Sequence, residues 1–475
     1  MVRRMLRFAL RHRSSRSLTL ASVAFVSFVL GACSKGGKDD GIDDAPARDG
    51  GAVRDSGVLP VPPGDLAGSR DPALCPVGAA DGCCPLLRYG GTDPDCPSLG
   101  CSALVRSTPI QLDAAAIDYD TAGQVGLAWN GRELAAAWTE YVPDFGTGKS
   151  FLHFERYGLD GKRTFGPMRQ RVTDSAARLV PGVTDLGYEP MQDMYVLATT
   201  NGGRYAALGL DRDGKPGWLT QLGDYCDSLT GHVRVLPIGT EALIAQQQGC
   251  SSSMQPRADF LQPGGASAAS VLLGDGMRPS QSSSGVFAFD AKQRRLLAVY
   301  QREYEKTLMG RYVDAATHKA QAAFELAPAA TSPARTELGL GFDGQRYGVL
   351  IETRQGTSSF AQHFQLYAPP GGWVGQQAQL GSPRAVLPPS VIWTGSGYLV
   401  AAMTFDGPSL PIDPSRFTAR LWSLTADGTL RELFDVDRMP ALYPTLVWAG
   451  GRVALAWVRL QGSRATHMLQ FLSCG

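Results

Sequence analysis

The sequence is poor in charge and lacks the patterns that mark long helices or common catalytic centres. Charged residues make up 19% of the 475 residues, and no sustained heptad pattern occurs. Neither a Gly-x-Ser-x-Gly elbow nor a His-Glu-x-x-His motif occurs, so the sequence carries no signature of an α/β-hydrolase or a zinc protease. Glycine and proline are abundant, at 56 and 31 residues, and this composition indicates a turn-rich, all-β protein.

The net charge of +1 conceals an uneven distribution. The first 32 residues hold six arginines and no acid, so the rest has 39 basic and 44 acidic side chains, a net charge of −5. This mildly acidic body predicts no nucleic-acid partner. Gly148-Lys149-Ser150 matches only the end of a phosphate-binding loop, because Pro143 replaces the required first glycine. We therefore expect no nucleotide.

Residues 1–32 have the form of an export signal. A cationic segment, "MVRRMLRFALRHRSSR", precedes the apolar stretch "SLTLASVAFVSFVLGA", whose 16 residues are too few for a stable membrane span. The following "LGAC" resembles the lipobox of bacterial lipoproteins, in which a cysteine becomes the acylated first residue. The resemblance implies lipidation of Cys33. Because Ser34 follows, it also implies an outer-membrane anchor with a periplasmic or surface-exposed head.

Residues 33–74 form the next compositional unit. They are rich in Gly, Asp and Pro and contain few large apolar residues, so they cannot bury enough surface to fold alone. A flexible coil of about 40 residues would span roughly 35 Å. We interpret this unit as a tether between the lipid anchor and a folded head.

Seven internal repeats define the remainder of the chain. Each 15-residue copy reads as a short strand ending in a large residue, a tight turn and a second strand with alternating apolar residues. The third position is aromatic in six copies and proline in one, and a glycine fills the turn in five. The copies are "LAWNGRELAAAWTEY" from Leu127, "LGYEPMQDMYVLATT" from Leu186, "VLPIGTEALIAQQQG" from Val235, "FAFDAKQRRLLAVYQ" from Phe287, "LGFDGQRYGVLIETR" from Leu340, "VIWTGSGYLVAAMTF" from Val391 and "LVWAGGRVALAWVRL" from Leu446.

The spacing of the copies predicts a seven-bladed β-propeller over residues 102–475. Successive copies start 59, 49, 52, 53, 51 and 55 residues apart, and a second hairpin, often with Asp-Gly at its turn, separates them. Four strands per period of about 50 residues are typical of propeller blades. A pair of β-sandwiches is the main alternative, but it would not require seven matching hairpins.

The last repeat leaves room for a third strand but not for a fourth. The segment "ALVRSTPIQLD" (103–113) precedes the first repeat and has no other partner, so we expect it to complete the last blade. This closure would bring Cys101 and Cys474 together where the chain is cut. We predict a disulfide between them, closing a loop of several hundred residues and stabilising the fold by roughly 5 kcal/mol in the chain-entropy model.

The other cysteines also suit an oxidising compartment. Nine cysteines less Cys33 leave eight, and export favours four disulfides over a zinc site. Cys226 and Cys250 lie in loops on either side of the third repeat and form a plausible pair. The remaining cysteines allow two pairings that avoid the strained neighbour bond, and both stay open: Cys75, Cys83, Cys84 and Cys96.

The Cys-rich segment 75–101 and the repeats share one family resemblance. "DGCCP" and "DPDC" resemble segments of secreted lipoproteins from myxobacteria-like bacteria, which also carry degenerate propeller repeats. We expect no cofactor. Asp81, Asp93 and Asp95 could hold calcium among oxygen ligands, but their spacing equally suits a plain turn. His153, His363 and His467 recur on third strands, and we interpret them as ordinary strand residues rather than metal ligands.

The loops between second and third strands supply the candidate binding residues. Loops on a rigid scaffold concentrate function, and these four are the longest of their type. We expect them to bind a protein or a glycan, so that the protein is a lipid-anchored binding or scaffolding module. The alternative is a carbohydrate-active hydrolase or lyase that uses two of the carboxylates. The candidates are Glu140, Tyr141, Asp144, Glu303, Tyr304, Glu352, Arg354, Asp406 and Asp413.

Overall fold

The computed structural model describes most of the chain between residues 103 and 474. All of these residues belong to one compact unit, Asp65–Gly475. The predicted signal peptide, tether and Cys-rich segment lie outside the described residues and stay predictions. No described helix is long and apolar enough to cross a membrane. The internal gaps are 114–116, 119–121, 143–147, 173–181, 202–203, 225–232, 239–240, 249–254, 275–284, 302–306, 328–337, 356–358, 382–383, 386–388 and 406–413.

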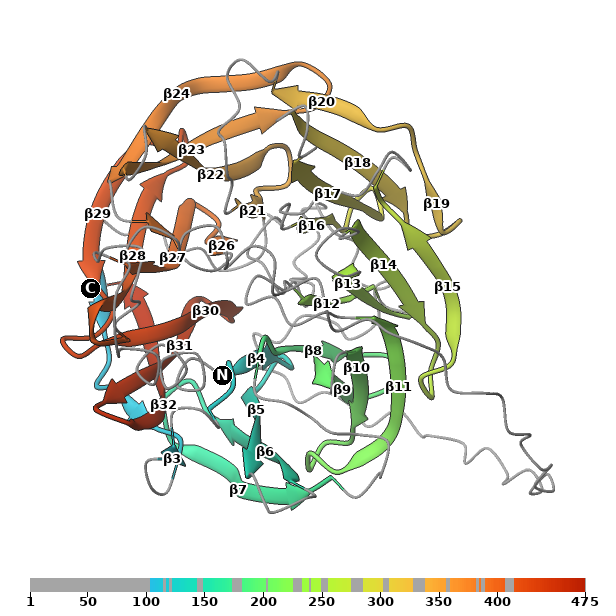
Figure 1. Ribbon diagram of the computed structural model, residues 1–475, viewed down its shortest axis with the longest axis vertical. Helices are drawn as coiled ribbons and strands as arrows, with labels where there is room; N and C mark the ends of the chain where they lie inside the picture. Colours follow the sequence, from blue (N-terminus) through green and yellow to red (C-terminus); the bar gives the residue numbers. More distant parts are fainter. Residues whose placement is uncertain are drawn as a thin grey trace, which may run out of the picture. The chain divides into compact units, whose positions relative to one another are not determined.

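Seven antiparallel sheets follow one another around a ring, which confirms the predicted seven-bladed β-propeller (Figure 1). Each blade runs from an inner strand near the axis to an outer strand at the rim. Blade 1 contains β4 (Gly126–Trp129), β5 (Leu134–Val142), β6 (Lys149–Tyr157) and β7 (Arg163–Arg171); blade 2 contains β8 (Asp185–Glu189), β9 (Met194–Asn201), β10 (Arg204–Leu210) and β11 (Pro216–Asp224); blade 3 contains β12 (Val233–Pro237), β13 (Ala242–Gln248), β14 (Gln255–Leu261) and β15 (Ser267–Leu272).

The remaining blades add short extra strands to the same plan. Blade 4 contains β16 (Val286–Asp290), β17 (Arg295–Gln301), β18 (Leu308–Asp314), β19 (Lys319–Ala320) and β20 (Phe324–Ala327); blade 5 contains β21 (Leu338–Phe342), β22 (Tyr347–Gln355), β23 (Ser359–Ala368) and β24 (Gly372–Gly381). Blade 6 contains β25 (Arg384–Ala385), β26 (Ser390–Trp393), β27 (Gly397–Phe405), β28 (Phe417–Thr425) and β29 (Leu430–Asp435), with the short 3-10 helix η3 (Pro414–Arg416) before β28; blade 7 contains β30 (Ala441–Ala449), β31 (Arg452–Gln461) and β32 (Arg464–Cys474), completed by the N-terminal strands described below.

Each repeat forms the first hairpin of its blade, and its fourth residue often caps the turn. The side-chain Oδ1 of Asn130 accepts hydrogen bonds from the backbone N–H groups of Arg132 and Glu133, at 2.9 and 2.8 Å. Asp343 accepts two such bonds in blade 5. The glycine that follows adopts a positive φ, 93° at Gly131, which explains the recurrent glycine.

The hydrophobic core is divided among the seven interfaces between neighbouring blades. One cluster of buried residues straddles each interface. At the third position of the repeats, every described side chain is aromatic and packs against the preceding blade. The alternating pattern of each repeat therefore serves packing between blades, as expected. These aromatic residues are Trp129, Tyr188, Phe289, Phe342, Trp393 and Trp448.

Direct hydrogen bonds also connect the inner strands of neighbouring blades. Asp185, just before the second repeat, accepts the N–H of Val235 in blade 3 at 2.8 Å. Ser390, at the same place in blade 6, accepts the N–H of Leu446 at 3.1 Å. Gly126 takes this position in blade 1, where a Cβ would lie only 2.8 Å from the backbone nitrogen of Leu186. In these three blades, the position thus bears either a bridging acceptor or no side chain at all.

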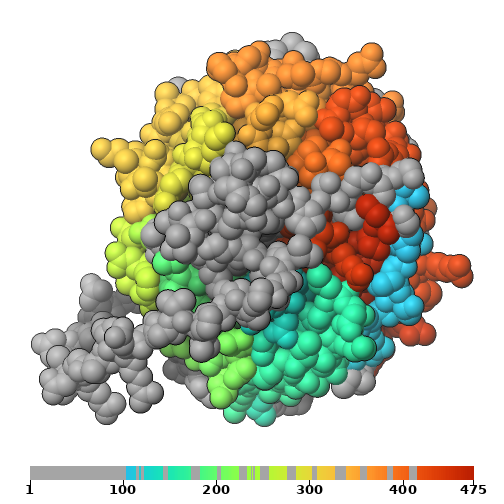
Figure 2. All heavy atoms as spheres, turned by 180° about the vertical axis from the view of Figure 1, so that it is seen from behind, coloured from blue at the N-terminus to red at the C-terminus, as the bar shows by residue number. Residues whose placement is uncertain are grey.

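The N-terminal segment closes the ring, as predicted, but as three short strands rather than one. β1 (Leu104–Arg106), β2 (Ile110–Gln111) and β3 (Ile117–Asp118) all pair antiparallel with β32. Pro109 has no N–H to donate, which is one reason the strand is broken. Ser107 bridges the first break, since its backbone N–H donates to Phe471 and its Oγ accepts the Phe471 N–H at 3.0 Å. In Figure 2 these blue strands lie against the red C-terminal blade.

Candidate functional site

The strand directions give the propeller two distinct ends. In blade 1, β5 ends at Val142 and β6 begins at Lys149, so the second and third strands join at one end of the blade. We call this end of the ring the loop face, and we call the opposite end, where the first hairpin turns lie, the base. β32 runs as a third strand from the loop face to the base, so Cys474 and its register partner Leu104 lie at the base.

The structure describes few of the nine predicted loop-face side chains. Those of Glu140, Tyr141 and Glu352 are described, whereas Arg354 is placed on β22 by its backbone alone. Glu352 is buried, with 1% of its surface exposed, and Tyr141 is half-buried. Their binding roles stay predictions. The other five candidates lie outside the described residues: Asp144, Glu303, Tyr304, Asp406 and Asp413.

Glu140 belongs to an internal ion-pair network on the face of blade 1 that packs against blade 7. Its Oε2 lies 2.8 Å from Nε2 of His153 and accepts a hydrogen bond from Nε of Arg169 at 2.9 Å. Arg169 in turn stacks on the ring of Phe151, 3.5 Å from its centroid. The hydrogen bond from His153, supported by Arg169, lowers the pKa of Glu140 from 4.5 to about 2, against the opposing effect of burial. Glu140 is therefore a permanent anion at neutral pH.

A second carboxylate on the same face has the opposite character. Glu155 is 1% exposed, accepts a short hydrogen bond from the Tyr157 hydroxyl, and lies 3.0 Å from Nε of Arg163. Burial raises the pKa of Glu155, although Tyr157 and Arg163 partly counteract it. Burial also raises the pKa of Tyr157. Two carboxyl groups on one face of the blade 1 sheet thus have pKa values displaced in opposite directions by their surroundings.

The third part of this region joins the two ends of the chain. Nδ1 of the fully buried His467 lies 2.9 Å from Oδ2 of Asp113, and Nε2 lies 2.8 Å from the carbonyl oxygen of Gly123. Both facing atoms are hydrogen-bond acceptors, so each ring nitrogen of His467 has an oxygen within hydrogen-bond distance. The backbone N–H of His467 also donates to Asp113, at 2.7 Å. Asp113 thereby supplies hydrogen bonds to β32 at the second break of the closing strand, which lies between β2 and β3.

Trp138 connects these groups. Its ring stacks on His153 at a centroid distance of 4.9 Å and lies 5.0 Å from the ring of His467. Its Nε1 is buried and has no hydrogen-bond partner among the described residues. We call this region the closing seam, and it comprises Asp113, Trp138, Glu140, His153, Glu155, Tyr157, Arg163, Arg169 and His467.

The closing seam revises the interpretation of the strand histidines. His153 and His467 are not isolated, because blades 1 and 7 are neighbours and the two rings flank one indole. Each histidine pairs with a carboxylate instead of facing the other. Within the described ranges, no group of three or more His, Cys, Asp or Glu residues is placed to hold a metal ion. The calcium candidates Asp81, Asp93 and Asp95 lie outside these ranges.

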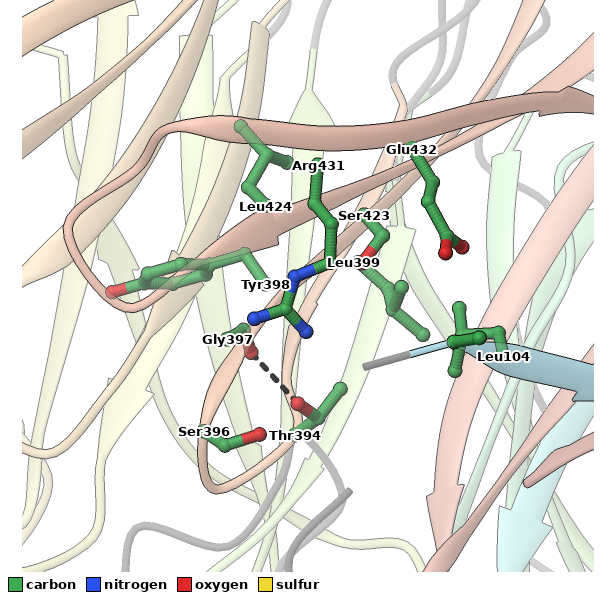
Figure 3. A pocket seen from close by; sticks show the side chains of 11 residues that line it. Leu104, Thr394, Ser396, Gly397, Tyr398, Leu399, Ser423, Leu424, Arg431 and Glu432 are labelled. Atoms are coloured by element: carbon green, nitrogen blue, oxygen red, sulfur yellow. Dashed lines mark hydrogen bonds between the residues drawn. The ribbon is translucent and has the colours of Figure 1, made fainter. Parts of the chain in front are cut away.

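A small cleft opens at the base between blade 6 and the start of the closing strand (Figure 3). Its volume is only about 10 Å³, which leaves room for about one water molecule. Figure 3 shows Arg431 reaching into the middle of the cleft, toward the turn at Thr394, and Leu104 at its edge. We call it the base cleft. Its lining residues are Ala103, Leu104, Thr394, Ser396, Gly397, Tyr398, Leu399, Ser423, Leu424, Arg431 and Glu432.

Cys474 is the one cysteine among the described residues. It is disulfide-bonded, and its partner lies outside them. The predicted pairing with Cys101 therefore stays a prediction, as do the other disulfides. It is supported by the register that places Leu104 opposite Cys474. The lipidation candidate Cys33 also lies outside the described residues.

Comparison with known proteins names no family. No family model and no curated protein matches the sequence. Among solved structures, the chain is similar to the Dos1 propeller, at 10% identity and a TM-score of 0.44, over 77% of this chain and 95% of that chain. It is also similar to the β-propeller domain of the Trilobed protease from Pyrococcus furiosus, at 9% identity and a TM-score of 0.40, over 75% and 94% of the two chains.

A third similar structure is the polysaccharide lyase Uly1, at 11% identity and a TM-score of 0.46, over 76% of this chain and 91% of that chain. The seven sheets of the structure themselves define the class of the protein: it is a seven-bladed β-propeller closed by N-terminal strands.

Proposed function

We propose that this propeller is a lipid-anchored module of the bacterial outer membrane that binds a protein or glycan through its loop face. The observation that carries the proposal is the position at which the chain enters the ring. Leu104 pairs with Cys474 at the base, whereas β5 ends and β6 begins at the loop face. An anchor at Cys33, joined through residues 33–102, would hold the base toward the lipid and leave the loop face directed outward.

The alternative, a carbohydrate-active hydrolase or lyase, receives less support from the described carboxylates. A glycosidase needs one carboxyl group that holds a proton and a second that stays ionised, both in contact with the sugar. Glu140 cannot hold a proton at neutral pH, because its pKa is about 2. Glu155 has a raised pKa but is 1% exposed, so no substrate can reach it in this conformation.

A pulldown tests the binding proposal. The tagged full-length protein, cross-linked in its native envelope, should recover a specific protein or glycan. Glu303→Ala with Tyr304→Ala should reduce that recovery severalfold, because both residues are predicted to lie on the loop face. Asp427→Ala, in a base turn where Asp427 accepts the N–H of Thr429, is the matched control and should leave recovery unchanged. Recovery of no specific partner, or equal loss in the control, would contradict the proposal.

A separate experiment tests the anchor. Cys33→Ala should move the protein from the membrane fraction to the soluble fraction and abolish labelling by a fatty-acid probe. Continued labelling of the variant would show that the anchor lies elsewhere. Because the substitution is remote from the propeller, the thermal unfolding of the soluble variant should match that of the wild-type head.

A further inference from the structure

The outer strand of blade 1 differs in charge from the outer strand of every other blade. β7, at the rim of the ring, carries Arg163, Arg169 and Arg171 and no acidic residue (Figure 1). The chain after residue 32 has a net charge of −5, so this row of arginines stands out from the rest of the protein. The other described outer strands each have a net charge of 0 or −1, counted over β11, β15, β19 with β20, β24, β29, and β1 to β3.

The three arginines project from the same face of the blade 1 sheet. In the register between β6 and β7, they lie opposite Phe151, His153 and Tyr157. These partners are an even number of residues apart, so their side chains and those of the arginines share one face. At about 3.4 Å per residue, the step from Phe151 to Tyr157 makes the row about 20 Å long. A row of this length suits a chain with several acidic groups better than one small anion.

Two of the arginines are held in place by buried carboxylates behind them. Nε of Arg169 donates to Glu140 at 2.9 Å, and Nε of Arg163 lies 3.0 Å from Glu155. The two arginine side chains are 46% and 36% exposed, and within the described ranges their terminal η nitrogens form no hydrogen bond. Arg171 is exposed and pairs with no described residue.

This arrangement prepares the guanidinium groups for an external anion. The two η nitrogens of a guanidinium group form a rigid fork that matches the paired oxygens of a carboxylate or the oxygens of a sulfate. Because Glu140 and Glu155 already fix the orientation of two forks, a bound anion would cost little side-chain entropy. The outward-facing atoms of the row are therefore preorganised hydrogen-bond donors with a positive charge.

The surroundings of the row favour a hydrated polymer over a protein or a membrane. The two large apolar side chains of β7, Phe165 and Met168, face the other way and pack in the core between blades 1 and 2. None of the exposed large apolar side chains of the described chain lies on blade 1. Protein interfaces have an apolar or aromatic centre, and insertion into a membrane also needs apolar side chains. The row lacks both features and offers charge alone.

We propose that the outer strand of blade 1 binds an acidic polysaccharide, whose carboxylate or sulfate groups engage Arg163, Arg169 and Arg171. This rim site is separate from the loop face, so the inference goes beyond the proposed function. A polymer bound along β7 would lie across the side of the propeller and leave the loop face free for its own partner.

Binding of the purified full-length protein to polygalacturonate and to dextran sulfate tests the rim site, with neutral dextran as the reference. Calorimetric titration in mild detergent should show binding to at least one acidic polymer, weakening as salt is added, and none to dextran. Arg171→Gln should weaken the binding about tenfold, because it removes charge-assisted hydrogen bonds. Arg438→Gln removes the same charge from an exposed residue in the link between blades 6 and 7 and is the matched control. Its affinity should change less than about twofold.

Arg169→Lys separates the fork from the charge. The lysine keeps the positive charge, but Glu140 would occupy its single ammonium group, so this variant should bind about as weakly as Arg171→Gln. Thermal unfolding should show that the variant is folded. Arg171→Gln tests the site independently, since Arg171 makes no contact on which the closing seam depends.

Three results would overturn the proposal: no binding to either acidic polymer, equal binding to the acidic polymers and to dextran, or equal weakening by Arg171→Gln and Arg438→Gln. Binding to phosphatidylglycerol vesicles through Arg171, in place of the polymers, would also overturn it and would identify a membrane surface instead. Glu303→Ala with Tyr304→Ala alters only the predicted loop face and should leave polymer binding unchanged. Failure of the rim site and failure of the proposed function are therefore distinguishable.

Discussion

Two neighbouring interfaces, between blades 6 and 7 and between blades 7 and 1, bury a tryptophan at the same repeat position in different ways. Trp457 of blade 7 donates from Nε1 to Oδ2 of Asp437 at 2.8 Å, and Arg459 donates to the same oxygen at 2.6 Å. Trp138 of blade 1 has no such partner among the described residues and instead lies between the rings of two histidines. One interface uses a single local acceptor, and the other uses a network.

The difference reflects how each interface is connected. Asp437 lies only 20 residues before Trp457, in the segment that links blades 6 and 7. In the closing seam, Asp113 and His467 are 354 residues apart, so no short covalent link sets their register. Buried polar groups are costly unless their hydrogen bonds are made, so the contacts between Asp113 and His467 disfavour any other register. We interpret the closing seam as the device that selects the correct closing strand.

The largest expected effect separates the two aspartates. Asp113→Ala leaves two buried donors of His467, its backbone N–H and its ring Nδ1, without their acceptor and should lower the free energy of unfolding by about 2–5 kcal/mol. Asp437→Ala removes three hydrogen bonds from a better solvated site, since Arg459 is 34% exposed, and should cost about 1–3 kcal/mol. Urea denaturation without reductant measures both. Equal losses would show that the closing seam is not special.

A smaller effect distinguishes the two glutamates within the closing seam by pH. The lowered pKa of Glu140 stabilises the fold above the unfolded value of 4.5, and this stabilisation is lost as the pH falls toward about 2. Glu140→Gln should therefore cost about 2 kcal/mol at pH 7 and progressively less below pH 4.5.

Glu155→Gln is the control, because its effect on stability should change with pH in the opposite direction. Because its pKa is raised, the contribution of Glu155 is present below the unfolded value of 4.5 and is lost as the pH rises through the folded value. The free energy of unfolding of the wild type, minus that of this variant, should thus fall with increasing pH. Denaturation curves from pH 3 to 8 should give opposite slopes for the two variants, and parallel slopes would refute the assignment.

The smallest expected effect concerns the two tryptophans. Trp457→Phe loses volume and the hydrogen bond to Asp437, whereas Trp138→Phe loses volume and aromatic contacts but no hydrogen bond of the indole N–H. Trp457→Phe should be less stable than Trp138→Phe by about 1 kcal/mol in thermal unfolding. A more stable Trp457→Phe would contradict the contrast drawn between the two interfaces.

The sequence was sufficient for the ring but not for the closing seam. The seven blades follow from local periodicity, and the closing strand follows from the absence of a fourth strand after the last repeat. The closing seam depends on side chains far apart in sequence, such as Asp113, Glu140 and His467, which no repeat pattern connects. One signal was available: closure makes blades 1 and 7 neighbours, so His153 and His467, both on third strands, should lie close together.

The candidate loop-face residues were harder to predict, because strand alternation does not show where a strand ends. Glu140 was expected in a loop region but lies on β5, where it is buried and forms hydrogen bonds with His153 and Arg169. The turn caps at Asn130 and Asp343 could have been recognised from the fourth repeat position. The base cleft could not have been recognised from the sequence, since its lining comes from both a blade 6 turn and the start of the closing strand.

Non-reducing peptide mapping of the purified full-length protein tests most directly how the ring is closed. The account predicts a disulfide-linked peptide that joins Cys474 to Cys101, consistent with the pairing of Leu104 and Cys474 across the closing strands. A linkage of Cys474 to Cys75, Cys83, Cys84 or Cys96 would contradict it.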